Sequence, residues 1–200
     1  MFSLSKNLIV EKATVVTMKY AFYLGVLGGA IAWAAIIMSI ILSPWWDIWT
    51  GNLSQLGSVE RPYSYVYNTG LTIAGIIFGI YSVSLIDVTK SRVGALASGI
   101  FLIASVHLIG VAIFASQPDL HTFSSGEFFG LTSLAIIFFG IALLSDGHWK
   151  HGALSLSLFA IGWGGSIIID FPSNAFLEVY NLILMTIWVL TLTHYSLTKK

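Results

Sequence analysis

Six long apolar stretches, separated by short polar breaks, constrain the fold of this chain more than any other feature. They cover about 20–43, 63–86, 93–115, 126–145, 152–170 and 176–196. A helix needs roughly 20 apolar residues to cross a bilayer core about 30 Å thick. Open strands are excluded, because lipid offers no partner for unpaired backbone groups. The sequence therefore predicts an all-α, polytopic membrane protein whose six transmembrane helices form one bundle within residues 20–196.

The composition agrees with a chain that is mostly embedded in the lipid bilayer. Only 9% of its 200 residues are charged and 56% are hydrophobic, whereas a soluble domain has about 25% charged residues. The formal net charge is zero, so no basic surface points to nucleic acid as a partner. The chain has no cysteine, which excludes disulfides, thiolate metal sites and a cysteine nucleophile.

The basic residues predict how the bundle is oriented. In the predicted topology one side of the membrane holds Lys6, Lys12, Lys19, Lys90, Arg92, Lys150, Lys199 and Lys200, and the other holds only Arg61. Because Lys and Arg concentrate in cytoplasmic segments, we expect both termini in the cytoplasm of a cell whose plasma membrane holds the protein. Residues 1–19 are predicted to lie along the membrane surface, and 197–200 to form a basic cytoplasmic tail. Most acidic residues fall on the outer side, which is one reason to look there for function.

Short similarities within the chain suggest an internal repeat. "VYNTGL" at 66–71 opens the second span and "VYNLIL" at 179–184 opens the sixth. One interpretation is a bundle of three repeated helical hairpins. Small residues, such as Gly75 and Gly79 in the second span, predict close approach between helices.

Three polar residues are the catalytic candidates. Asp119 and His121 are predicted in the loop before the fourth span, and Glu127 at the start of that span. Carboxylates and imidazoles serve as general acids and bases or as ligands of a divalent metal, so a metal site is left open. The alternative for Glu127 is a capping box, in which "SSGE" begins the helix. Haem is not favoured, since no second histidine lies at the depth of His107.

A wider set of polar residues is predicted to bind a ligand at the outer end. The set is Asn52, Ser54, Glu60, Arg61, Asn68, His107, Asp170 and Asn181. Polar and ionisable groups inside membrane helices usually face a cavity or a partner, so we expect one shared outward-facing pocket. The alternatives are structural: Asn68 and Asn181 could hydrogen-bond across helices, His107 could bond to a backbone carbonyl, and the charges could be solvated.

Two segments carry the resemblance of this chain to a known family. "NLSQLGSVERPYSYVYNTGLTIAGIIFGI" and "IGVAIFASQPDLHTFSSGEFFGLTSLAIIFFGIALL" resemble the two blocks of the domain of unknown function 998 family. The matching positions are Asn52, Ser54, Leu56, Gly57, Asn68, Gly70, His121, Phe128 and Phe129. "GVAIF" departs from the family pattern by one inserted residue beside Gly110. The resemblance implies a six-helix prokaryotic, often archaeal, membrane protein, and it implies no activity.

Several functions fit these observations. The first is an enzyme or a binding site for a lipid headgroup or another small outer-leaflet molecule, with His121, Asp119 and Glu127 in the chemical role. The second is a non-catalytic subunit of a larger membrane complex, in contact with lipids and with a membrane-protein partner or further copies of itself. A carrier of small solutes is less favoured, because the inner halves of the spans are almost purely apolar.

Overall fold

The described part of the chain is built almost entirely from long helices. The computed structural model describes residues 23–198. Its elements are α2 (Tyr23–Ile41), the 3-10 helix η1 (Leu53–Gly57), α3 (Ser64–Ser84), α4 (Arg92–Ile113), α5 (Pro118–Ser145), α6 (Trp149–Ile168) and α7 (Asn174–Thr198). All six α-helices are long and apolar enough to cross a membrane, and residues 23–198 contain no strand. The prediction of an all-α, six-helix membrane bundle is confirmed. The predicted surface segment 1–19 and the last two residues of the tail lie outside the described residues.

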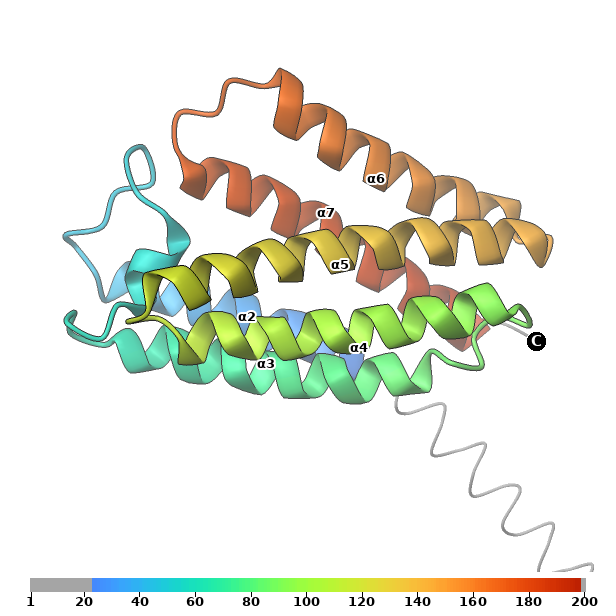
Figure 1. Ribbon diagram of the computed structural model, residues 1–200, viewed down its shortest axis with the longest axis horizontal. Helices are drawn as coiled ribbons and strands as arrows, with labels where there is room; N and C mark the ends of the chain where they lie inside the picture. Colours follow the sequence, from blue (N-terminus) through green and yellow to red (C-terminus); the bar gives the residue numbers. More distant parts are fainter. Residues whose placement is uncertain (1–22, 199–200) are drawn as a thin grey trace, which may run out of the picture.

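The helices run side by side and meet at two ends (Figure 1). One end, called here the η1 end, carries residues 42–63, 114–117 and 169–173; the opposite end carries 85–91 and 146–148. From α2 to α5, each helix packs against the next one along the chain. α6 stays close to α5 only near the opposite end and leans away from it toward the η1 end (Figure 1).

Aromatic side chains fill the centre of the bundle. Trp188 of α7 is fully buried and stands edge-on to Phe101 of α4, with 5.2 Å between the ring centroids. Phe139 of α5 packs on the same indole at 5.9 Å. Tyr81 of α3 is also fully buried, and its hydroxyl lies 3.0 Å from the Thr193 hydroxyl of α7. These contacts join α3, α4, α5 and α7 in the half of the bundle away from η1.

The fourth predicted span begins earlier than expected. It was predicted from residue 126, but α5 begins at Pro118. Proline is well suited to the first helical turn, because a backbone N–H at that position would have no acceptor within the helix. The negative charge of Asp119 is also favourable at the positive end of the helix dipole. Asp119 and His121 therefore lie in a helix and not in a loop. The predicted capping box is also wrong: Ser124 and Glu127 lie inside α5, where Ser124 is buried.

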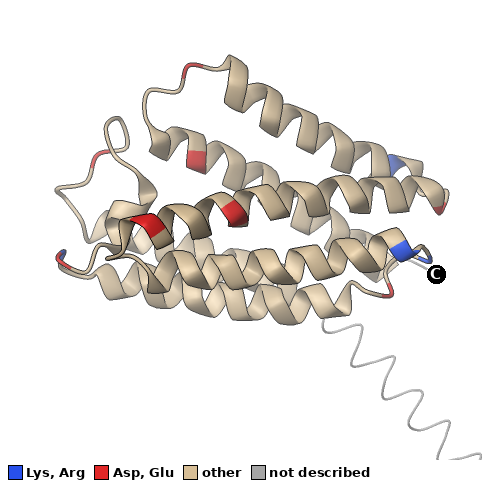
Figure 2. Cartoon of the chain, in the orientation of Figure 1, with Lys and Arg blue, Asp and Glu red and all other residues tan. Residues whose placement is uncertain are grey.

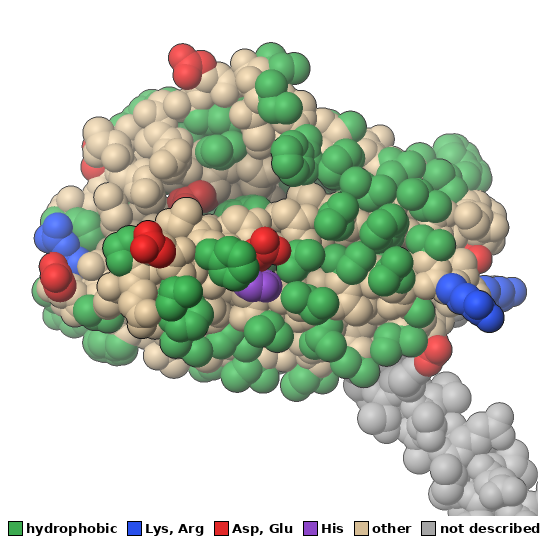
Figure 3. All heavy atoms as spheres, in the orientation of Figure 1, with side chains coloured by type: hydrophobic (Ala, Val, Ile, Leu, Met, Phe, Trp, Pro, Cys, Tyr) green, Lys and Arg blue, Asp and Glu red, His purple; other side chains and the backbone are tan. Residues whose placement is uncertain are grey.

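Charged residues gather at the two ends of the bundle. Figure 2 shows Lys and Arg mainly at the opposite end, whereas most acidic residues lie toward the η1 end. Figure 3 shows many hydrophobic side chains between the ends on one face, and exposed side chains such as Ile76, Val106 and Ile168 add to the apolar surface. An apolar belt with charges at both rims is the surface that a membrane-spanning bundle needs.

Candidate functional site

An apolar cavity of about 270 Å³ lies among α2, α3, α4, α5, α7 and η1. Most of its wall is hydrocarbon or aromatic, from side chains such as Ile36, Leu71, Phe78 and Met185. Its polar lining residues are Trp33, Ser54, Tyr67, Ser105, His121, Ser125, Thr132, Glu178 and Thr186. Ligand sites commonly combine a mostly apolar wall with a few polar groups that orient the ligand. This cavity has that composition.

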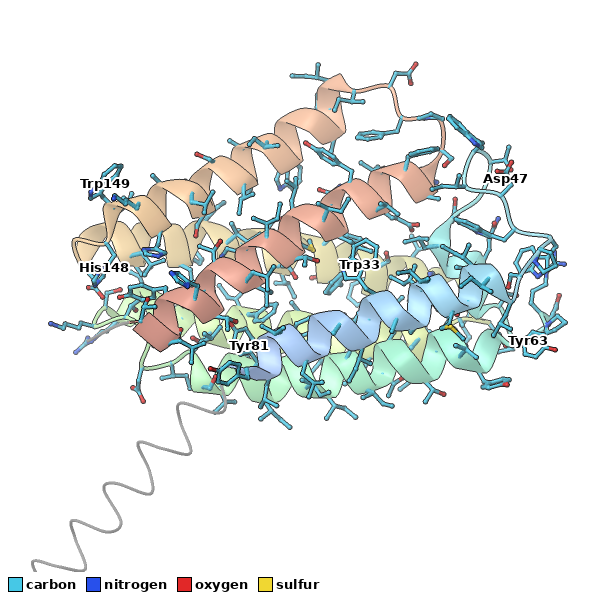
Figure 4. All side chains as sticks on the ribbon, turned by 180° about the vertical axis from the view of Figure 1, so that it is seen from behind. Trp33, Asp47, Tyr63, Tyr81, His148 and Trp149 are labelled. Carbon is cyan, nitrogen blue, oxygen red and sulfur yellow. The ribbon has the colours of Figure 1, made fainter. Side chains whose placement is uncertain are left out.

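The apolar cavity is bordered by small and lipid-facing residues of α2 and α7. Gly29 and Val26 of α2 line it, as does Leu190 of α7, and Val26 and Leu190 are 40% and 46% exposed. Trp33 crosses from α2 to α7, where its indole N–H donates to the Thr186 hydroxyl at 2.9 Å (Figure 4). The cavity therefore reaches the side of the bundle that faces the membrane interior, beside a hydrogen bond that ties α2 to α7.

Glu178 is the carboxylate of this cavity. It lies in the second turn of α7, about 6 Å along the helix from Asn174 at 1.5 Å per residue. Its Oε2 accepts a hydrogen bond from the backbone N–H of Leu53, the first residue of η1, at 2.7 Å. A carboxylate placed among apolar side chains is costly and marks a functional position by default. Glu178 thus connects the cavity wall to the outer loop.

A second cavity, the polar cleft, lies where α6 leans away from α5. It has a volume of about 320 Å³ and is enclosed by α5, α6 and α7; Figure 3 shows the surface hollowed between α5 and α6. Its lining residues are Ser125, Phe129, Ser133, Gly162, Trp163, Ser166, Asn174, Leu177, Glu178 and Asn181. Ser125, Phe129 and Glu178 line both cavities. One wall therefore separates a polar space from an apolar one.

Two of the predicted binding residues hold η1 in place. The Asn68 side chain donates to the Gly57 carbonyl at 2.8 Å, which fixes the end of η1 on α3. The Asn52 N–H donates to the side-chain oxygen of Gln55 at 3.3 Å, and the Asn52 carbonyl accepts from the Trp46 indole at 2.9 Å. Neither residue lines a cavity. Their hydrogen bonds hold η1, and Ser54 of η1 lines the apolar cavity.

The three catalytic candidates do not come together. His121 lines the apolar cavity, and its Nδ1 donates to the Val111 carbonyl at 3.0 Å. Asp119 is exposed and, like Glu127, lines neither cavity. Residues two apart on a helix point in different directions, which separates Asp119 from His121. Within residues 23–198 no group of three or more His, Asp or Glu side chains is placed to hold a metal ion.

The remaining candidates are divided between the cleft and the surface. Asn181 lines the polar cleft and donates to the Ser166 hydroxyl at 3.1 Å and to the Leu177 carbonyl at 3.0 Å. Glu60, Arg61 and Asp170 are exposed; the Arg61 guanidinium stacks on the Trp45 ring at 4.2 Å. His107 packs edge-on against Phe123 with 5.5 Å between the ring centroids and lines neither cavity.

Comparison with known proteins places the chain in a family. The model of a family described as "protein of unknown function (DUF998)" matches residues 26–195. The chain belongs to this family. The match covers all six membrane-spanning helices almost completely, so the family and the bundle are the same unit. Neither the curated proteins nor the solved structures compared with this DUF998 chain gave a match.

The sequence alone did not single out Glu178, which lines both cavities. This residue was treated as one of several acids at the outer ends of the spans. The signal was its position inside the sixth apolar run, three residues before Asn181 on the same helix. A carboxylate and an amide at that spacing lie on the same face of a helix, and both line the polar cleft.

Proposed function

We propose that this protein binds an amphipathic, lipid-like molecule, with the apolar chain of the ligand in the apolar cavity and its polar head beside Glu178. The observation that carries the proposal is the apolar cavity itself, because it combines a hydrocarbon wall with polar groups clustered on α5, α7 and η1. Its volume of about 270 Å³ is well above the roughly 150 Å³ of a dry cavity that accepts benzene. Several carbons of an alkyl chain therefore fit.

The surroundings of the cavity support a ligand that arrives from the bilayer. Val26 and Leu190 border the cavity and face the apolar exterior. A hydrocarbon chain that moves from lipid into this space exchanges one apolar environment for another, so it loses little solvation free energy. Affinity then comes from packing and from the polar groups around Glu178.

The second part of the proposal concerns the orientation of the bundle in the membrane. We infer that the η1 end faces the outside of the plasma membrane of a prokaryotic cell, so that the ligand is an outer-leaflet molecule. The asymmetry of Lys and Arg along the sequence supports this orientation, and the family resemblance supports the archaeal or bacterial setting. Membrane lipids are the partners that the proposal requires.

Photolabelling tests the proposed binding. The full chain is placed in lipid nanodiscs with an amphiphile whose alkyl chain carries a diazirine, and labelled peptides are mapped after irradiation. We expect labels on the α2 and α7 residues that line the apolar cavity. In Gly29→Leu the labelling of these residues should fall at least tenfold. Gly29 lines the cavity and a Cβ built on it meets nothing within 4 Å, so the leucine enters open space.

Gly99→Leu is the matched control. Gly99 of α4 is exposed, lines neither cavity, and also has nothing within 4 Å of an added Cβ. This variant should label like the parent protein. Labels spread evenly over the lipid-facing surface, with no difference between the two leucine variants, would overturn the proposal.

A further inference from the structure

We propose that the polar cleft binds the head of the same ligand, and that this head is a neutral, hydroxyl-rich group such as a sugar or another polyol. The inference rests on the proposed function, because it assigns the head of the molecule whose chain occupies the apolar cavity. The starting observation is that Ser125, Phe129 and Glu178 line both cavities, so the two spaces adjoin at these three side chains.

Ser133, Ser166, Asn181 and Glu178 present hydrogen-bond acceptors to the cleft. The hydroxyls of Ser133 and Ser166 donate to the carbonyls of Phe129 and Gly162 in their own helices, at 2.8 and 2.7 Å. Both bonds to the Asn181 side chain are donated by its Nδ2, which leaves its Oδ1 to accept. The Glu178 carboxylate, when ionised, can accept hydrogen bonds but cannot donate them. A matching ligand must therefore bring hydrogen-bond donors.

Charge excludes the phosphate head of a common phospholipid. Within the described residues, neither cavity lining contains Lys or Arg, which are the side chains that phosphate recognition uses. An ionised Glu178 would also repel a phosphate. The hydroxyls of Ser133 and Ser166 would not serve it as donors, because they already donate to backbone carbonyls.

The spread of acceptors favours several hydroxyls over one ammonium group. Acceptors come from three helices: Ser133 on α5, Ser166 on α6, and Asn181 with Glu178 on α7. A single cation would be held by one charge, whereas a polyol places separate O–H donors around its ring or chain. Trp163 of α6 also lines the cleft and offers an apolar ring surface to the C–H face of a sugar. The cleft therefore fits a polyol better than an amine.

Native mass spectrometry with matched octyl compounds tests the head group. The full chain is held in a polyoxyethylene detergent, which has no sugar head, and titrated with octyl glucoside, octyl phosphocholine, octylamine and octanol. We expect octyl glucoside to bind at least tenfold more tightly than each of the other three. Asn181→Leu should weaken glucoside binding about tenfold and leave octanol binding unchanged. Thr191→Val, on the same helix but outside both cavities, should change neither.

The outcomes separate the two proposals. If all four compounds bind equally, and Gly29→Leu removes the binding of each, the lipid-like ligand stands and the polyol head is wrong. Preference for octylamine or octyl phosphocholine also overturns the polyol head. If no octyl compound binds the parent protein, the proposed function fails together with this inference. If Asn181→Leu weakens glucoside and octanol alike, the cleft does not recognise the head group.

Discussion

At the residue scale, Glu178 joins the loop to the site. Its carboxylate accepts the N–H of Leu53, a residue that is only 2% exposed, and it also lines both cavities. A ligand that approaches Glu178 therefore meets a group already bonded to η1. This arrangement holds the carboxylate in one place before a ligand arrives, which lowers the cost of ordering it on binding.

The hydrogen bond from Leu53 predicts a graded effect of two substitutions. Glu178→Ala leaves the buried Leu53 N–H without its acceptor, and such a loss costs about 1–3 kcal/mol. Glu178→Gln keeps a side-chain oxygen that can accept the bond, so it should cost less than half as much. Thermal unfolding in detergent measures the difference; about 1 kcal/mol corresponds to roughly 2–4 °C for a chain of this size. Equal melting temperatures for Ala and Gln would contradict the role of the bond.

Particular residues show what the sequence could predict about the site. His121 and Ser54 were predicted and line the apolar cavity, and Asn181 was predicted and lines the polar cleft. Asp119 and Glu127 were grouped with His121 because they are near in sequence, but the turn of α5 separates them. Whether any of these residues binds a ligand or a metal stays a prediction. Helical direction, and not proximity along the chain, decided which side chains share a cavity.

At the element scale, apolar length predicted the helices and composition misplaced one boundary. The six spans follow from hydrophobic runs long enough for a bilayer. The fourth span was predicted to begin eight residues too late, because "PDLHTFSS" is polar enough to resemble a loop. In the fold this segment is the first part of α5, where Pro118 and Asp119 suit a helix start. The 3-10 helix η1 was also missed, since five residues carry too little periodicity to reveal it.

Close packing between α3 and α4 predicts that substitution by alanine will affect the stability of the bundle differently at two glycines of α3. A Cβ at Gly75 would lie 2.6 Å from Ile109 Cγ1 and 3.0 Å from the Ser105 carbonyl oxygen. Since a backbone atom cannot move aside cheaply, Gly75→Ala should destabilise the bundle by about 1–3 kcal/mol. A Cβ at Gly79 meets only Leu102 Cδ1, at 3.5 Å. Gly79→Ala should be neutral or stabilising by up to about 1 kcal/mol. Thermal unfolding of both variants checks the contrast, and equal losses would refute it.

The outer loop is fastened to the start of α7. The Ser173 hydroxyl donates to the Ile48 carbonyl and accepts from the Phe176 N–H at 3.4 Å, and the Ala175 N–H donates to the Gly51 carbonyl at 3.0 Å. Ser173→Ala removes a helix cap, at a cost of about 0.5–2 kcal/mol, together with the bond to the loop. We expect faster amide exchange in residues 46–57. The exposed Ser116→Ala should leave that exchange unchanged, and equal exchange in all three proteins would show that the loop is held elsewhere.

At the scale of the whole molecule, charge and apolar surface divide the bundle along its length. Most acidic residues lie toward the η1 end, on whose side of the bundle Ser54, His121 and Glu178 line the apolar cavity, whereas Lys90, Arg92 and Lys150 lie at the opposite end. His148 and Trp149 also lie there, at the turn between α5 and α6 (Figure 4). The polar cleft lies toward the η1 end, whereas Val26 and Leu190, which border the apolar cavity, lie in the half of the bundle nearer the basic end.

Cysteine labelling tests this orientation, and the chain is well suited to it because it contains no cysteine. Glu60 at the η1 end and Lys150 at the opposite end are both exposed, so a single cysteine at either position reacts without disturbing a packed contact. If Lys and Arg mark the cytoplasmic side, a membrane-impermeant maleimide added to intact cells should label Glu60→Cys. It should label Lys150→Cys only after the cells are permeabilised. The reverse pattern would place the η1 end, with Ser54, His121 and Glu178 on its side of the bundle, toward the cytoplasm and would remove the outer leaflet as the source of the ligand.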